Sequence, residues 1–306
     1  MLALSGMVLV FVAVLGGFVL EHGRLWVLMQ PAELLIIVGG AAGILLTANP
    51  WAVIVKMMNE SAAALRPCAH TRKSYLQHLR LLYEIFVYAK RGGGIAAIEP
   101  HIEDPGSSEI FANHPELLKD RLIRDFICDS LRMLVIGATN AHDLDLLMDL
   151  DIDIQRRGQH EPAKALSSIA DSLPGLGIVA AVLGVVITME AVGGSPEVVG
   201  QKVAAALVGT FLGILMCYGV VGPVAARLET VGEMQAQFLQ VLRICLVSFA
   251  RGASPILAVE YARRSIPIEV RPGFVELETS IRRDAVIPGA QKSVMPEQET
   301  SDVSAS

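Results

Sequence analysis

The feature that most constrains this chain is an uncharged stretch of 18 residues, Ser172–Met189. A stretch of that length can cross a lipid bilayer as one helix, in which every backbone polar group is paired. A second apolar run, Val203–Val221, follows the helix-breaking sequence Gly193-Gly194-Ser195-Pro196. The two runs predict a membrane hairpin with spans at residues 171–190 and 203–225, joined by a short link at 191–202.

Small residues recur at four-residue spacing in both runs of the hairpin. They are Ala180 and Gly184 in the first run, and Ala205, Gly209 and Gly213 in the second. Small residues at this spacing let helix backbones approach closely in lipid, where apolar burial alone drives little association. The hairpin is therefore expected to pack against other helices in an assembly.

Two further uncharged runs precede the hairpin, at residues 2–20 and 34–54. The chain of 306 residues is 53% hydrophobic with a mean hydropathy of +0.51, so its 31 acidic and 25 basic residues must be segregated. The sequence predicts an all-α protein with four transmembrane helices, at 1–20, 34–54, 171–190 and 203–225. The first run is not read as a signal peptide, because it lacks a basic n-region.

The positions of lysine and arginine predict the orientation of the spans. Only Arg24 and Lys202 lie outside two long segments, 55–170 and 226–306. Because basic residues concentrate on the cytoplasmic side, these segments and both termini are expected there, and the links 21–33 and 191–202 outside. The net charge of −6 argues against a nucleic-acid partner.

Both cytoplasmic segments have the pattern of helices. A first helix from Thr71 or Ser74 should end at Gly92-Gly93-Gly94, a second should run from Pro115 to Asn140, and a third should begin at Ala141. After the last span, a helical tail is expected at 226–288 and a disordered one at 289–306. Four scattered cysteines are expected to be reduced and structural: Cys68, Cys128, Cys217 and Cys245.

The sequence offers no catalytic constellation. Gly92-Gly93-Gly94 lacks the Lys-Ser/Thr of a phosphate-binding loop and reads as a helix terminator. An acidic run from Asp143 to Asp153 could hold a divalent cation through its carboxylates, although an acidic helix face is more often simply solvated.

For transport, the informative feature is the lack of a charged residue in the middle of any span. A proton relay needs an ionisable group at depth, so either the chain transports nothing or a partner helix supplies the acid. Thr210 is the polar residue nearest mid-span in the fourth helix; it could line a pore, but such threonines more often bond their own backbone. Pro174 and Pro223 lie at the same cytoplasmic membrane face, either as ordinary kinks or as a paired flexure.

Several motifs resemble the MotA family, the four-span A subunit of the bacterial flagellar motor stator, over nearly the whole chain. They are Gln30-Pro31-Ala32-Glu33-Leu34, Ser108–Ala112, Asp171-Ser172-Leu173-Pro174, Gly177–Val182, Val208–Leu215, Ala258-Val259-Glu260 and Arg271–Glu278.

The resemblance implies a pentamer in the bacterial inner membrane around two copies of a MotB-type B subunit, whose single helix carries the proton-binding aspartate. It implies a rotor partner, FliG, contacted through Arg91 and Glu99. It also implies that Pro174 and Pro223 couple conformational changes and that Ala181 and Thr210 line the ion path. No cofactor is implied. The long cytoplasmic segment resembles the branch that transports H⁺ rather than the Na⁺ branch.

Two departures from the family pattern are the glycines beside Arg91 and the presence of Thr188 where some relatives have histidine. Two alternative functions stay open at this point. One is an ExbB/TolQ-like energy-transducing proton channel, although those relatives typically have three spans. The other is a membrane-anchored, metal-dependent enzyme that uses the acidic run.

Overall fold

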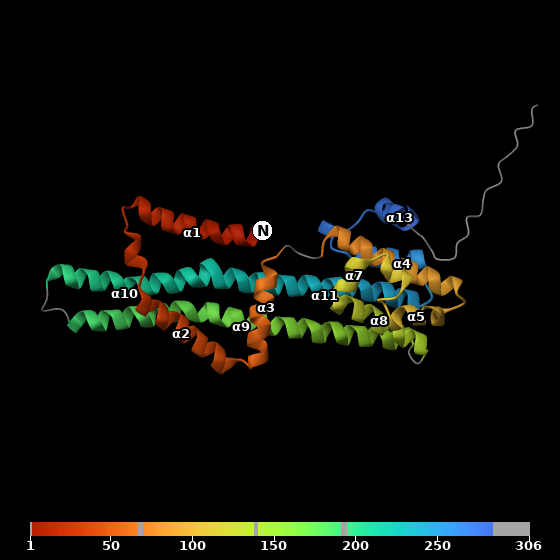
Figure 1. Cartoon of the computed structure of the whole chain (residues 1–306), viewed down its shortest axis with the longest axis horizontal. Coiled ribbons are helices and arrows are strands. Elements are labelled where there is room, and N and C mark those ends of the chain that lie inside the picture. Colours follow the sequence, from red (N-terminus) through yellow and green to blue (C-terminus); the bar gives the residue numbers. More distant parts are fainter. Residues whose placement is uncertain (1, 67–69, 138–139, 191–194, 284–306) are drawn as a thin grey trace, which may run out of the picture. The chain divides into compact units, whose positions relative to one another are not determined.

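A computed structural model describes the chain except for residues 1, 67–69, 138–139, 191–194 and 284–306 (Figure 1). All regular elements in the described ranges are helices, and four of them are long and apolar enough to cross a membrane, which confirms the predicted all-α, four-span class. The chain divides into two compact units. The membrane unit comprises residues 1–71 and 146–240, and the second unit comprises residues 72–145 and 241–306.

The membrane unit is built from long helices. They are α1 (Leu2–Leu20), η1 (Leu25–Leu28), α2 (Pro31–Ala48), α3 (Trp51–Ala64), most of α9 (Ala141–Glu190), α10 (Pro196–Met216), a π-helical segment (Cys217–Val221) and the first part of α11 (Gly222–Ala250). In this unit α9 and α10 run side by side and α2 crosses them (Figure 1). The apolar core between these helices consists of Ile37, Ala41, Ala170, Leu173, Ala180 and Cys217.

The second predicted span is shorter than the uncharged run at 34–54 suggested. Helix α2 ends at Ala48, and α3 begins at Trp51 after the extended residues Asn49 and Pro50. The reason is local, because the ring of a proline disfavours helical backbone in the residue before it. Asn49 has φ −131° and ψ 143°, and its side-chain amide donates to the Leu45 carbonyl at 3.2 Å.

Small residues form the contact between α9 and α10 within the hairpin, whereas their spacing was interpreted as packing against other helices in an assembly. A methyl group on Gly213 would lie 2.6 Å from the Leu173 carbonyl oxygen, and one on Gly184 would lie 2.7 Å from Cβ of Ala206. The backbones are therefore too close for larger side chains at these positions. In α2, Gly39 and Gly43 have the same four-residue spacing, but a methyl group on either would meet open space within this chain.

The helix expected from Ala141 and the third span are a single helix in the structure. Helix α9 has 50 residues and contains Pro162 and Pro174. The fourth span likewise continues through the π-helical segment into α11. The junctions expected between membrane spans and cytoplasmic helices are thus not breaks in helical structure.

The second unit contains shorter helices. They are α4 (Arg72–Arg91), η2 (Ile95–Ile98), α5 (Glu99–Glu103), α6 (Glu109–Ala112), α7 (Pro115–Lys119), α8 (Arg121–Ile136), the end of α11, α12 (Pro255–Ser265), η4 (Ile268–Val270) and α13 (Phe274–Arg283). Its core includes the stacked rings of Phe86 and Phe249, whose centroids are 4.0 Å apart. Leu79, Leu82 and Leu131 are fully buried beside such contacts.

The prediction of a single helix from Pro115 to Asn140 is wrong in two respects. The structure has two helices here, and the second one ends before Asn140. Asp120 separates α7 from α8, since its carboxylate accepts from the Ile123 amide at 3.3 Å and caps α8. Helix α8 ends at Ile136 with Gly137 in the left-handed conformation (φ 69°). Asn140 instead begins α9, because its side-chain oxygen accepts from the His142 and Asp143 amides at 2.9 Å.

Three of the four cysteines lie in the described residues. Cys128, Cys217 and Cys245 are buried and have free thiols, as predicted, while Cys68 lies outside the described residues. Burial raises the pKa of the Cys128 thiol to about 11, so the reactive thiolate is scarce at neutral pH. These cysteines pack as small apolar residues.

Candidate functional site

The two predicted ion-path residues lie at the contact between α9 and α10. The hydroxyl group of Thr210 on α10 donates to the Gly177 carbonyl oxygen on α9 at 3.5 Å. The backbone nitrogen of Ala181 lies 3.3 Å from where a methyl group on Gly209 would be. Both Thr210 and Ala181 are half-buried. The hydroxyl bond crosses between two helices, so the more common bonding of threonine to its own helix is not what is found here.

A third polar residue, Glu33 on α2, reaches the same helix pair. Its side chain is 7% exposed, and its Oε2 atom is buried and has no hydrogen-bond partner in the described part of the chain. A methyl group on Gly209 would lie 2.6 Å from Oε2, and one on Gly184 would lie 3.4 Å from Oε1. The two glycines therefore leave the space that the carboxyl group occupies.

Sequence reasoning gave Glu33 no role, although it is the single acid inside a 24-residue apolar segment, Leu25–Ala48. It placed Glu33 at the end of the link 21–33, just before span two. Two signals were available: an acid within the first turn of a membrane helix, and glycines on the two helices that could receive it. Nothing in the one-dimensional pattern says that α2 packs against those glycines.

The predicted coupling residues differ in their surroundings. Pro174 lies within α9, half-buried, one residue after the fully buried Leu173. Pro223 is exposed and follows the π-helical segment, at the end of which the Gly222 backbone N–H donates a hydrogen bond to the Cys217 carbonyl oxygen. A wider helical turn next to a proline accommodates the missing amide donor, and such segments mark places where helices bend.

A charged cluster and a cavity lie on the α9–α11 face near Pro223. His160 Nε2 lies 3.7 Å from Glu229 and 3.6 Å from Glu233, and Arg156 pairs with Glu233 at 2.9 Å. The cavity, of about 370 Å³, is lined by His160, Ala163, Lys164, Ser167, Gly222, Ala225, Ala226 and Glu229. Polar contacts thus link the two helices beside the position of the exposed proline.

The two predicted rotor-contact residues lie in the second unit, on either side of the glycine turn. Arg91 ends α4 and Glu99 begins α5, and both side chains are exposed. Gly93 and Gly94 have φ of 86° and 142°, a conformation that glycine adopts without strain. Within the described residues neither charge has an ion-pair or hydrogen-bond partner, so the pair does not form a local staple.

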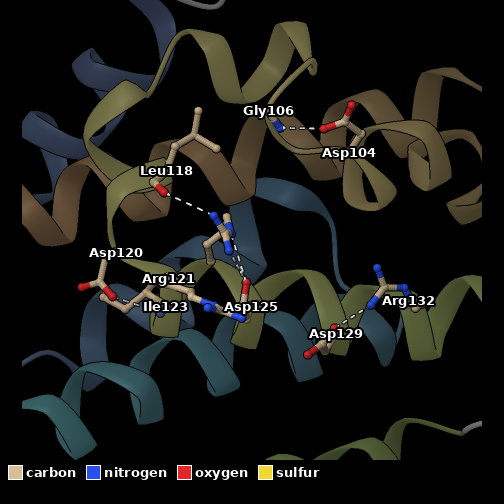
Figure 2. A network of polar contacts seen from close by, with 10 residues as sticks. Asp104, Gly106, Leu118, Asp120, Arg121, Ile123, Asp125, Asp129 and Arg132 are labelled. Atoms are coloured by element: carbon tan, nitrogen blue, oxygen red, sulfur yellow. Dashed lines mark hydrogen bonds and ion pairs between the residues drawn. The ribbon is translucent and has the colours of Figure 1, made fainter.

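Charges on α8, in contrast, are paired with one another (Figure 2). Asp125 accepts hydrogen bonds from Arg124, and these hold the pKa of that carboxyl below its usual value. Arg132 pairs with Asp129 at 2.6 Å and with Glu103 at 2.7 Å. These charges are engaged within the unit, whereas Arg91 and Glu99 are not.

In the acidic run at 143–153, Asp145 forms ion pairs that stabilise the second unit. Asp145 accepts from Arg243 at 2.7 Å and from Arg251 at 2.9 Å, which joins the start of α9 to the end of α11 within the second unit. Among the described residues, no three His, Cys, Asp or Glu side chains converge as metal ligands would.

Four helices long and apolar enough to cross a membrane, with small-residue contacts between them, define the class of a multi-pass helical membrane protein. Comparisons with known proteins agree. Residues 118–240 match the sequence model of the MotA/TolQ/ExbB proton channel family, and residues 4–93 match that of the motility protein A N-terminal region.

Motility protein A of Salmonella typhimurium is 37% identical over 92% of this chain and 95% of its own length. Motility protein A of Escherichia coli is 36% identical over the same shares. The structure of C. jejuni MotAB matches the fold with a TM-score of 0.74 at 18% identity, covering 89% of this chain and 98% of that one. The chain belongs to the motility protein A family.

Proposed function

We propose that this chain is the A subunit of a flagellar motor stator, which together with a B subunit conducts ions and converts their flow into torque on the rotor. The observation that carries the proposal is the family membership over 92% of the chain. The match of residues 4–93 to the motility protein A N-terminal region favours the stator over an ExbB/TolQ-like energiser, because it includes the first span.

The partners follow from the same relationship. Two relatives of known structure are MotAB complexes, so the partner is a MotB-type subunit with a single membrane helix. Five copies of this chain would surround two of the partner in the bacterial inner membrane, with both termini in the cytoplasm. The partner's aspartate supplies the proton-binding group at mid-membrane depth.

Each candidate residue then has a proposed role. Ala181 and Thr210 line the ion path beside the partner helix. Pro174 and Pro223 relay helix movement to the cytoplasmic part of the chain, a role supported by the π-helical segment before Pro223. The exposed and unpaired charges of Arg91 and Glu99 contact the rotor protein FliG.

The function is tested in liposomes loaded with a pH-sensitive dye. The chain together with its partner should carry protons when a membrane potential is imposed. The chain alone should not, since it has no ionisable group at mid-membrane depth. Rapid proton leak through the chain alone, or none through the complex, contradicts the proposal.

The transported ion is proposed to be H⁺. At fixed proton-motive force, swimming speed should not depend on the sodium concentration of the medium. Potassium replacement at equal ionic strength is the control. A speed that rises with sodium and vanishes without it would assign the ion as Na⁺.

A further inference from the structure

The buried carboxyl group of Glu33 lies beside the helices that carry Ala181 and Thr210, and the proposed function assigns it no role. Glu33 is the third residue of α2, yet its carboxyl lies against Gly184 and Gly209 in the neighbouring helices. Gly184 precedes the end of α9 at Glu190 by six residues, which is about 9 Å along a helix at 1.5 Å per residue. The carboxyl group is thus well inside the outer end of the spans.

The surroundings of the carboxyl group are apolar. The helix elements around it contribute Gly184, Ala206 and Gly209, and the buried hydroxyl group of Thr188 is already used in a 2.7 Å bond to the Gly184 carbonyl. Among the residues that the structure describes, Oε2 has no hydrogen-bond partner. An ionised carboxylate without a partner in such a place is very costly, whereas a neutral carboxylic acid is tolerated.

Among the described residues, no basic side chain forms an ion pair with the Glu33 carboxyl group. On α10, Lys202 precedes Gly209 by seven residues, about 10 Å along the helix, and Glu197 lies further out. On α9, Asp171 and Glu190 flank the apolar stretch, and on the α2 side Arg24 precedes η1. The neutral state of Glu33 therefore depends on a bound proton.

We propose that Glu33 is a proton-binding residue at the periplasmic end of the ion path, seated as a neutral acid in the notch formed by Gly184 and Gly209. This rests on the proposed stator function. In each transfer the carboxylic acid gives its proton to the carboxylate on the partner helix, and the resulting Glu33 carboxylate takes up a proton from periplasmic water. Proton number and charge are then unchanged at Glu33 over one cycle.

The first test does not require activity. Hydrophobic carbodiimides react with protonated carboxyl groups in apolar surroundings, and mass spectrometry locates the adduct on a peptide. In membranes that contain the full chain and its partner, Glu33 should be labelled at neutral pH and should lose labelling as the pH rises. Glu197, an exposed carboxylate in the first turn of α10, is the matched control and should stay unlabelled.

Two variants test whether the notch formed by Gly184 and Gly209 holds the Glu33 side chain. Gly209→Ala places a methyl group 2.6 Å from the flexible end of the Glu33 side chain and should displace it, which lowers labelling. Gly200→Ala, on the same helix with open space around it, should leave labelling unchanged. Absence of label on Glu33 at every pH, or equal labelling of Glu33 and Glu197, overturns the neutral, seated acid.

The second test measures proton flux. Glu33→Gln keeps the size and neutrality of the protonated acid, so the complex should assemble in normal amounts, but flux should fall by at least about tenfold. Glu33→Asp, which keeps an exchangeable proton, should retain more flux with a shifted pH profile. If Glu33→Gln conducts like wild type with the same pH profile, Glu33 only fills space. If the wild-type complex conducts no protons, the stator proposal fails instead, and the labelling result stands apart from it.

Discussion

The hydroxyl group of Thr210 donates to the Gly177 carbonyl oxygen on the neighbouring membrane helix, 33 residues earlier in the chain. Gly177 accepts this bond at a point where its own Cα is closely approached by α10, since a methyl group there would lie 2.8 Å from the Gly209 carbonyl oxygen. The proposed ion path therefore runs beside a close backbone contact between α9 and α10.

Replacement of Thr210 tests this hydrogen bond. Thr210→Val keeps the shape and removes the donor, so the melting temperature of the purified complex should fall slightly, because such bonds in membranes contribute about 0.6 kcal/mol on average. Thr210→Ser should melt close to wild type. Identical melting of the valine and wild-type complexes would show that the 3.5 Å contact has no stabilising effect.

The α9–α10 contact should tolerate no added methyl group at its closest point. Gly213→Ala would place a carbon 2.6 Å from the Leu173 carbonyl oxygen, which is backbone and cannot move aside easily. We expect a loss of about 1–3 kcal/mol, seen as lower yield of assembled complex and lower melting temperature. The matched control is Gly175→Ala in α9, where the added methyl group meets open space and should be harmless.

Replacing the two prolines should impair motility more than assembly. Pro174→Ala and Pro223→Ala restore amide donors within continuous helices, which should straighten and stiffen the two positions. Complex yield by gel filtration should stay near wild type while swimming speed falls. If both variants swim at wild-type speed, the two prolines are ordinary helix kinks and have no coupling role.

Charge reversal tests the rotor contact. Exposed pairs are worth about 0–1 kcal/mol each and are screened by salt, so neutralising one residue should only slow swimming, whereas Arg91→Glu adds repulsion and should reduce motility strongly. A reversed acidic residue on FliG should restore part of it. Arg121→Glu on α8, whose partner Asp125 lies within the same helix, serves as the control for a general charge effect.

In that experiment an internal pair would give a different result. If Glu99→Arg in the same chain rescues Arg91→Glu, and no change in FliG does, the two residues contact each other and the rotor assignment is wrong.

Acid should remove one ion-pair contribution in the second unit. Hydrogen bonds from Arg263, together with Arg264, lower the pKa of Glu260 from 4.5 to about 2. A carboxyl group whose pKa is lower in the folded state than in the unfolded state stabilises the fold at pH values above its unfolded-state pKa. This stabilisation is lost as the pH falls from about 4.5 through about 2. Glu260→Gln should therefore lower the melting temperature at pH 7. The gap from wild type should narrow within that acid range; a gap constant down to pH 2 contradicts the assignment.

The sequence allowed the membrane part to be predicted because length, lack of charge and small-residue spacing are local properties. The family motifs at 258–260 and 271–278 were also visible, but their structural use was not. Arg263 donates to the Pro272 carbonyl at 3.0 Å, a contact that exists only after the chain folds back on itself.

Other features depended on competition between local signals. Asp120 and Asn140 are both good helix caps, yet the periodic apolar residues around Asp120 concealed the break. The helix break at Asn49-Pro50 was likewise missed, because the residues around it carry no charge and were interpreted as one continuous span. The seat of Glu33 depends on which helices pack together, and no periodicity in α2 indicates that.

The π-helical segment at Cys217–Val221 has a consequence for insertions and deletions in this chain. Its hydrogen bonds span five residues instead of four, so it accommodates one residue more than an α-helix would. Deleting a single residue there would convert the segment into regular α-helix and leave the side chains beyond it on the same faces, whereas the same deletion within regular α-helix would turn every later side chain by about 100° around the axis. A one-residue deletion is therefore expected to be tolerated at this point of the helix and to change the packed face of α11 at any other point.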